Sequence, residues 1–107
     1  MSITINIYYT GENESAVKFA KEMEHSGIAD RIRAEKGNLR YDYFFPMNDK
    51  ETVLLIDAWK NKEALDSHHA SPMMKEIAVL REKYDLHMKV EQYSDIESDS
   101  DNRFIRK

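Results

Sequence analysis

The sequence predicts a single α+β domain with the element order β-α-β-β-α-β, the split βαβ arrangement of ferredoxin-like folds. Three observations support this prediction. Several segments alternate apolar and polar residues, as strands with one buried face do, while others repeat apolar residues at helical spacing. A short polar connection joins the second and third strands, which indicates an antiparallel hairpin. The length of 107 residues suits one hydrophobic core and leaves little room for a second.

The first half of the chain supplies a strand, a long helix and a second strand. The strand at residues 3–9 has one apolar side, which carries Ile3, Ile5, Ile7 and Tyr9. A helix then begins with Asn13 as its N-cap, loosens at residues 25–27 and stops at Gly37. Its inward positions are Ala16, Phe19, Ala20, Met23, Ile28 and Ile32. Residues 39–45, LRYDYFF, alternate again and predict the second strand.

The second half supplies the return strand, two helical stretches and the last strand. Residues 52–59 form a more fully buried strand, and a short helix follows from about Asn61. Ser71 caps the next helix, with Pro72 at its first position. The inward stripe of that helix is Met73, Ile77, Leu80 and Tyr84. The last strand covers residues 86–93, so residues 1–93 form the domain and residues 94–107 form a polar, acidic C-terminal tail.

Four strands in one antiparallel sheet need both helices on one face to bury the apolar helical stripes. The hairpin strands carry aromatic and aliphatic residues on both of their sides, so the second sheet face would expose apolar surface in a monomer. We therefore expect a homodimer that packs through this sheet face.

Composition excludes several classes of function. The chain has no cysteine, which excludes disulfides, thiolate metal sites and cysteine nucleophiles. Its net charge is -4, and its basic residues are scattered among acidic ones, so we expect no nucleic-acid binding. No apolar run approaches the roughly 20 residues that span a bilayer. The N-terminus lacks the pattern of a signal peptide, and we expect a cytoplasmic protein without membrane association.

Residues 37–77 carry a pattern that resembles a known family. The matching positions are Gly37, Leu39, Arg40, Tyr41, Tyr43, Trp59, His69, Ser71 and Pro72. This pattern closely resembles the antibiotic biosynthesis monooxygenase family of small dimeric α+β barrel proteins. The resemblance implies a dimeric α+β barrel, with a pocket in each subunit between the sheet and its helices.

The resemblance also implies a range of activities. Members of the family oxidise polyketide quinols or anthrones with dioxygen and use no metal, flavin or haem. Other proteins of this fold isomerise small phosphorylated sugars, degrade haem or have no assigned reaction. We therefore expect a cofactor-independent monooxygenase that acts on a small quinol-like, anthrone-like or otherwise enolisable substrate. The alternatives are a small-molecule isomerase and a non-catalytic module that binds a small ligand, for example in a stress response.

Such chemistry needs a base, hydrogen-bond donors for a developing oxyanion and a dry aromatic cavity. Asn6 is a candidate donor, and His69 or His68 is the candidate base, because imidazole titrates near neutral pH. Helical geometry lets only one of these two histidines face inward, and His69 is the choice that matches the family position. The candidate lining residues for substrate are Tyr8, Tyr41, Tyr43, Trp59, Met73 and Ile77. For each of these residues a plain packing role is the competing interpretation.

The sequence predicts neither a metal site nor a haem site. Adjacent His68 and His69 lack the i, i+4 spacing and the third ligand that zinc needs. The haem-degrading branch of this fold uses an Asn on its first strand, a Trp on its short helix and an iron-ligating His on the next helix. Asn6 fits the first position, but His68 and Ala78 occupy the other two. Alanine cannot ligate iron, which disfavours haem degradation and leaves His68 as the one alternative, unorthodox ligand.

Overall fold

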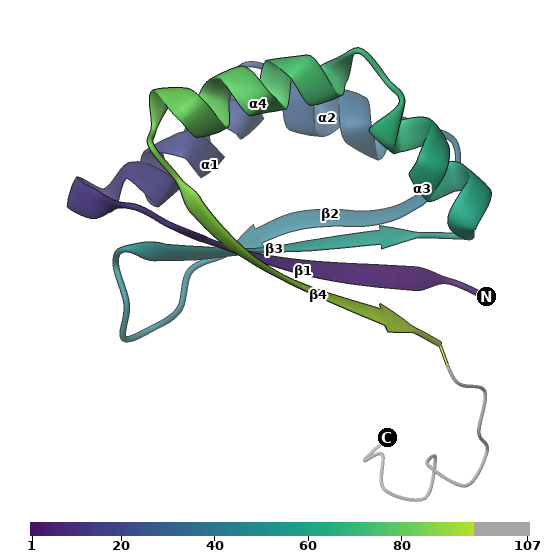
Figure 1. The fold of residues 1–107 in the computed structure, drawn as a ribbon, viewed down its shortest axis with the longest axis horizontal. Coiled ribbons are helices and arrows are strands. Elements are labelled where there is room, and N and C mark those ends of the chain that lie inside the picture. Colours follow the sequence, from purple (N-terminus) through teal and green to yellow (C-terminus); the bar gives the residue numbers. More distant parts are fainter. Residues whose placement is uncertain (96–107) are drawn as a thin grey trace, which may run out of the picture.

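The computed structural model describes residues 1–95 and confirms the predicted order of strands and helices (Figure 1). The elements are β1 (Ile3–Thr10), the 3₁₀ turn η1 (Glu12–Glu14), α1 (Ser15–His25), α2 (Ile28–Arg33), β2 (Asn38–Phe44), β3 (Thr52–Trp59), α3 (Lys62–His69), α4 (Met73–Lys83) and β4 (His87–Ser94). The predicted tail at 94–107 lies outside the described residues, apart from Ser94 and Asp95. Within the described part, no helix has both the length and the apolar character to cross a membrane.

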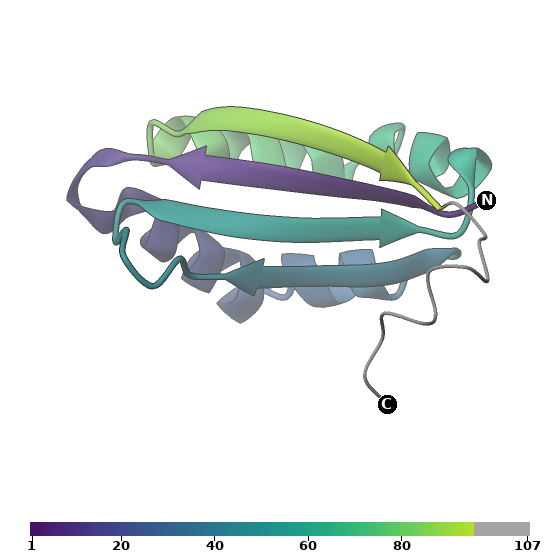
Figure 2. The same ribbon diagram turned by 90° about the horizontal axis from the view of Figure 1, so that it is seen from below.

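The four strands form one antiparallel sheet in the order β2-β3-β1-β4. All four helices lie on one face of this sheet, and Figure 2 shows that no other element of residues 1–95 covers the opposite face. The register pairs Ile3 with Trp59 and Ile5 with Asp57. Directly paired residues share a sheet face, so all four of these side chains point towards the helices.

The core lies between the sheet and the helices, as the apolar patterns predict. The alternation along β1 buries Ile3, Ile5, Ile7 and Tyr9. α1 contributes Phe19 and Met23, which are fully buried, and α4 contributes Ile77 and Leu80. Each fully buried side chain of this size stabilises the fold by about 1.5–3 kcal/mol, which fixes the helices over the sheet.

Two predicted helix boundaries are wrong and one is confirmed. Asn13 does not cap α1, because it adopts a left-handed conformation (φ 56°) inside the 3₁₀ turn that precedes the helix. Ser71 does not cap α4, because its hydroxyl is buried without a hydrogen-bond partner in the described part of the chain. Asn61 does cap α3, because its side-chain oxygen accepts a hydrogen bond from the backbone N–H of Ala64 at 2.9 Å.

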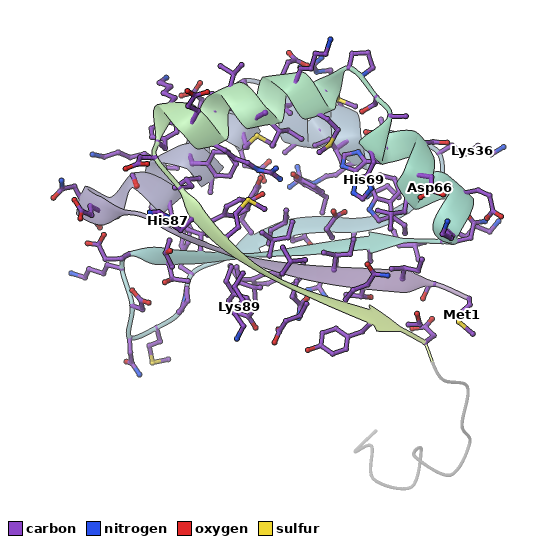
Figure 3. The ribbon with its side chains drawn as sticks, in the orientation of Figure 1. Met1, Lys36, Asp66, His69, His87 and Lys89 are labelled. Atoms are coloured by element: carbon purple, nitrogen blue, oxygen red, sulfur yellow. The ribbon has the colours of Figure 1, made fainter. Side chains whose placement is uncertain are left out.

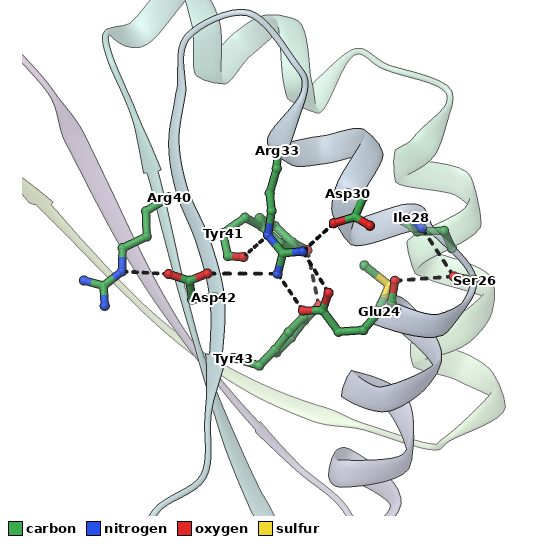
Figure 4. Close-up of polar contacts among 10 residues, drawn as sticks. Glu24, Ser26, Ile28, Asp30, Arg33, Arg40, Tyr41, Asp42 and Tyr43 are labelled. Carbon is green, nitrogen blue, oxygen red and sulfur yellow. Dashed lines mark hydrogen bonds and ion pairs between the residues drawn. The ribbon is translucent and has the colours of Figure 1, made fainter.

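The predicted long first helix divides at Ser26 and Gly27 into α1 and α2. Gly27 has φ 85°, a left-handed conformation that glycine adopts without steric cost. The break turns α2 over β2, where Arg33 holds it in place (Figure 4). Arg33 donates to Glu24 of α1 at 2.8 Å, to Asp30 at 2.9 Å and to the backbone oxygen of Tyr41 at 2.8 Å. This network fixes the C-terminal end of α2.

Candidate active site

Asp57 is a buried carboxyl in the middle of the sheet. It lies on β3 between the inward residues Leu55 and Trp59, and only 4% of it is exposed. The indole N–H of Trp59 donates a hydrogen bond to the Asp57 Oδ1 at 2.6 Å. Strand alternation sends all three side chains towards the helices. The same strand therefore supplies a carboxyl group and the donor that holds it.

His68 reaches this pair from α3. It is 3% exposed, and its ring stacks on the Trp59 ring with a centroid distance of 4.7 Å and an interplanar angle of 24°. Its Nδ1 lies 2.9 Å from the Oε1 of Glu35. Glu35 follows the end of α2, which Arg33 anchors. A turn, a helix and a strand thus place Glu35, His68, Trp59 and Asp57 in one chain of contacts.

Arg81 of α4 brings a positive charge to the same side of the sheet. Its Nη2 and Nε donate to the hydroxyl oxygen of Tyr9 at 2.9 and 3.2 Å. Tyr9 is fully buried on β1, and the guanidinium carbon lies 5.5 Å from the centre of its ring. The described residues therefore place a fixed cation among the acidic and phenolic groups.

Burial raises the pKa of three acidic groups on the helix-facing side of the sheet. It raises the pKa of Asp57 from 3.8 to about 6, although His68, the Trp59 N–H and Arg81 oppose the shift. Burial also raises the pKa of Tyr41 and Tyr43 above the ordinary value of 10.0. The phenols therefore remain neutral hydroxyl donors at neutral pH. Asp57 titrates close to neutral pH, which suits a general base.

The β4 edge of the site is open and apolar. The register pairs Met88 with Tyr9 and Val90 with Ile7, so both β4 side chains lie on the helix-facing side of the sheet. They are nevertheless 42% and 54% exposed. The helices therefore leave this edge uncovered in the described structure, and an apolar molecule can approach the inner sheet face from there.

The two histidines have the opposite arrangement to the predicted one. His68 is the buried ring, whereas His69 is exposed. The reason is helical spacing: Leu65 and His68 share the inward side of α3, and His69 is rotated from it by about 100°. The two ring centroids are 5.7 Å apart, so the exposed ring of His69 lies next to the buried ring of His68 (Figure 3).

Asn6 and Tyr8 do not join the predicted site. Both alternate with the inward residues of β1 and therefore lie on the sheet face without helices, as does Lys89 of β4 (Figure 3). The prediction that Asn6 converges with Trp59 and the histidines is wrong, because the helices cover the more apolar side of β1. The side-chain oxygen of Asn6 is buried and has no hydrogen-bond partner among the described residues.

The other predicted lining residues do face the helices. Tyr41 and Tyr43 have their hydroxyl oxygens 3.4 Å apart, and Trp59 is fully buried. Ile77 is buried on α4, and Met73 packs half-buried against the core. Their contact with a substrate stays a prediction.

Sequence reasoning missed Asp57, Arg81, Tyr9 and Glu35 as site residues. The sequence could have identified Asp57, because it is an acidic residue at an inward position of the apolar strand TVLLIDAW. A buried carboxyl group at such a position needs hydrogen-bond or charged partners. The sequence could also have identified Arg81, because it follows the inward Ile77 by four residues and therefore shares its side of the helix. No sequence pattern could have identified Glu35, since only the turn after α2 brings it to His68.

Comparisons with known proteins agree with this structure. The family model "Antibiotic biosynthesis monooxygenase" matches residues 2–79. The Bacillus subtilis (strain 168) protein named "Putative monooxygenase YcnE" is 27% identical over 67 residues, which are 63% of this chain and 68% of that protein.

Two solved structures have the same fold. A Deinococcus radiodurans protein described as a "putative antibiotic biosynthesis monooxygenase" superposes with a TM-score of 0.77 at 22% identity, covering 92% of this chain and 95% of that one. SnoaB, a cofactor-independent oxygenase from Streptomyces nogalater, gives a TM-score of 0.74 at 12% identity, with 91% and 95% covered. The family match spans most of the domain, and the chain therefore belongs to the antibiotic biosynthesis monooxygenase family.

Proposed function

We propose that this chain is a cofactor-independent monooxygenase that oxidises a small quinol-like, anthrone-like or otherwise enolisable aromatic substrate with dioxygen. The reaction takes place between the sheet and the helices. The observation that carries this proposal is the buried Asp57, whose pKa is raised to about 6 and which the Trp59 N–H holds in place. Family membership supports the reaction class, and SnoaB, a cofactor-independent oxygenase, supports the absence of a cofactor.

The first step is proton transfer to the carboxylate of Asp57. An anthrone-like methylene or a phenol that loses its proton becomes electron-rich enough to give one electron to dioxygen directly. The resulting radical pair combines to a peroxide on carbon. For a methylene, the balanced overall reaction is R₂CH₂ + O₂ → R₂C=O + H₂O. The cation of Arg81 and the neutral phenols of Tyr41 and Tyr43 are the groups that stabilise the developing oxyanion.

The residues along the β4 edge suit an apolar aromatic substrate. Met88 and Val90 line the open β4 edge, and Ile5 and Ile7 lie between this edge and β3. A flat aromatic molecule that enters here displaces water from the apolar strand surface. Water exclusion strengthens the interaction of the bound anion with Arg81.

The bare sheet face is our proposed homodimer interface. It carries Leu54 and Ile56 of β3, Tyr8 of β1 and Tyr93 of β4, which alternate with the inward residues of their strands. A second copy that packs its own sheet here removes this apolar surface from water.

Replacing Asp57 with asparagine tests the activity. We expect Asp57→Asn to lower oxygen uptake with naphthoquinols and anthrones by about 100-fold to 10,000-fold, because the general base is lost. Asp66→Asn is the matched control, since it removes an exposed carboxylate from α3. Uptake is measured with an oxygen electrode after subtraction of the spontaneous rate.

Equal rates in wild type and Asp57→Asn would remove Asp57 from the mechanism. Thermal stabilisation of the wild type by these compounds without any oxygen uptake would instead identify a binding module.

A further inference from the structure

Glu35 and His68 form a second acid–base pair beside Asp57, and the first step of the proposed reaction does not use it. Nδ1 of His68 lies 2.9 Å from Oε1 of Glu35, with the two side chains 3% and 18% exposed. The His68 ring stacks on the same indole whose N–H binds Asp57. Two proton carriers on different elements therefore meet at Trp59.

The contact with Glu35 determines which nitrogen of the His68 ring carries the shared proton. A carboxylate oxygen only accepts, so the Nδ1 of His68 carries the shared proton. The two nitrogens of an imidazole point in different directions, which leaves Nε2 directed away from Glu35. Stacking on Trp59 holds the ring plane. His68 can therefore gain and release a proton at Nε2 while Glu35 balances the positive charge.

Glu35 also connects this pair with the surface. It lines a hollow of about 470 Å³, together with Lys60, Asn61 and Ser67. The hollow includes Gly37 beside the start of β2, and β2 and β4 are the opposite edge strands of the sheet. Solvent therefore reaches Glu35 from the side away from the β4 edge. A proton can therefore return to His68 without crossing the apolar substrate space.

We propose that His68, positioned by Glu35, is the acid of the second half of the reaction, while Asp57 is the base. This inference rests on the proposed function. Asp57 first returns its proton to the peroxide anion, which gives a hydroperoxide, and then removes the remaining C–H proton. The electron pair of that bond forms the carbonyl, the O–O bond breaks, and the departing hydroxide takes the Nε2 proton of His68 to form water. Asp57 then releases its proton to water, and His68 regains one through Glu35.

Single-turnover experiments with anthrone separate the two halves of the reaction. Oxygen uptake reports the first half, anthraquinone absorbance reports the second, and a ferrous xylenol orange assay after an acid quench reports hydroperoxide. In His68→Gln we expect oxygen uptake close to that of the wild type, anthraquinone formation about 10-fold to 100-fold slower, and hydroperoxide that accumulates.

The Glu35→Gln variant tests the positioning role. It should show the same pattern with a smaller loss, in kcat and not in KM, because substrate does not contact Glu35. Glu63→Gln is the matched control, since Glu63 lines the same hollow. Proton NMR adds a measurement that needs no turnover: the downfield Nδ1 proton of His68 should disappear in Glu35→Gln and persist in Glu63→Gln.

The possible outcomes distinguish this inference from the proposed function. Anthraquinone formation at the wild-type rate in His68→Gln overturns the acid role, and so does a parallel loss of oxygen uptake and anthraquinone without hydroperoxide. Absence of the downfield Nδ1 proton in the wild type overturns the positioning role of Glu35. If the wild type still consumes oxygen in these experiments, such results contradict only the roles of His68 and Glu35, and the monooxygenase proposal is unaffected. A wild type that consumes no oxygen with any anthrone or quinol overturns both proposals.

Discussion

At the scale of single residues, Asp57 combines a functional role with a cost in stability. Burial of a carboxyl group disfavours its charged form, and the partial compensation by Trp59, His68 and Arg81 leaves the pKa raised. The charged form of Asp57 therefore costs stability that a neutral hydrogen-bonding residue of similar size would not cost. A base with these properties is useful for removing a proton from a weakly acidic substrate.

The raised pKa of Asp57 predicts a pH-dependent stability with a definite sign. Between pH 3.8 and about 6 the folded state holds a proton that the unfolded state has lost, so the free energy of unfolding falls as pH rises. The difference amounts to about 3 kcal/mol at pH 7. We expect Asp57→Asn to lose this dependence and to be more stable than wild type at pH 7.

Urea unfolding of wild type and Asp57→Asn at pH 4 and pH 7 measures this difference, with Asp66→Asn as the exposed control. A wild type that becomes more stable than Asp57→Asn as pH rises through this range would contradict the buried, compensated carboxyl described here.

At the scale of elements, the placement of α3 decides whether His68 reaches Trp59. Asn61 caps the start of α3, and Ala64 in its first turn packs on the backbone of Gly37. Gly37 has φ 86° and also accepts a hydrogen bond at its oxygen from the N–H of Lys60 at 2.8 Å. The start of α3 is therefore seated directly on the turn that leads into β2.

Gly37→Ala should disturb this contact. A Cβ at Gly37 would lie 2.5 Å from the Cβ of Ala64, so α3 must shift, in addition to the steric cost of a left-handed alanine. Gly27→Ala is the matched control, because Gly27 has φ 85° and no neighbouring heavy atom of residues 1–95 lies within 4 Å of the added Cβ. We expect Gly27→Ala to lose about 1 kcal/mol and Gly37→Ala distinctly more.

Thermal unfolding of both variants checks this prediction. The double variant Gly37→Ala/Ala64→Gly should recover part of the loss, because it removes the colliding methyl group. Equal melting temperatures for Gly27→Ala and Gly37→Ala would show that α3 moves away from Gly37 without strain.

At the scale of the whole molecule, the two faces of the sheet have different roles. The helix-facing side holds the core and the polar cluster around Trp59, and it is open along the β4 edge and at the hollow beside Glu35. The other face has no covering element within residues 1–95 and carries half-buried Leu54 and Ile56. The helices alone therefore leave the apolar surface of this sheet incompletely buried, which is the basis of the proposed dimer.

A charge in the middle of the bare face should separate the two subunits. We expect the wild type to have the mass of a dimer in size-exclusion chromatography with light scattering, and Ile56→Glu to have the mass of a monomer, because burial of an unpaired carboxylate is unfavourable. Val79→Glu is the control, since Val79 is 65% exposed on α4, on the helical side. A monomeric wild type at micromolar concentration would rule out the dimer.

The sequence by itself determined the fold and the family. Strand alternation at Ile3, Ile5 and Ile7 and the helical stripe at Ile77 and Leu80 are local patterns, and tertiary contacts reinforce them. The bounds of β3 were predicted without error, because its apolar run has clear turn residues before it. The same patterns indicated that both faces of the sheet are apolar.

Only the tertiary structure decided which polar residues share a site. Asn6 and His69 were chosen by residue type and family position, but strand alternation and helical rotation place Asn6 on the other sheet face and leave His69 exposed. Glu35 reaches the ring of His68, and Arg81 reaches the phenol of Tyr9, each from a segment far away in the chain. These contacts between distant residues depend on the orientation of the helices on the sheet. The packing of the whole core sets that orientation, and no local sequence pattern encodes it.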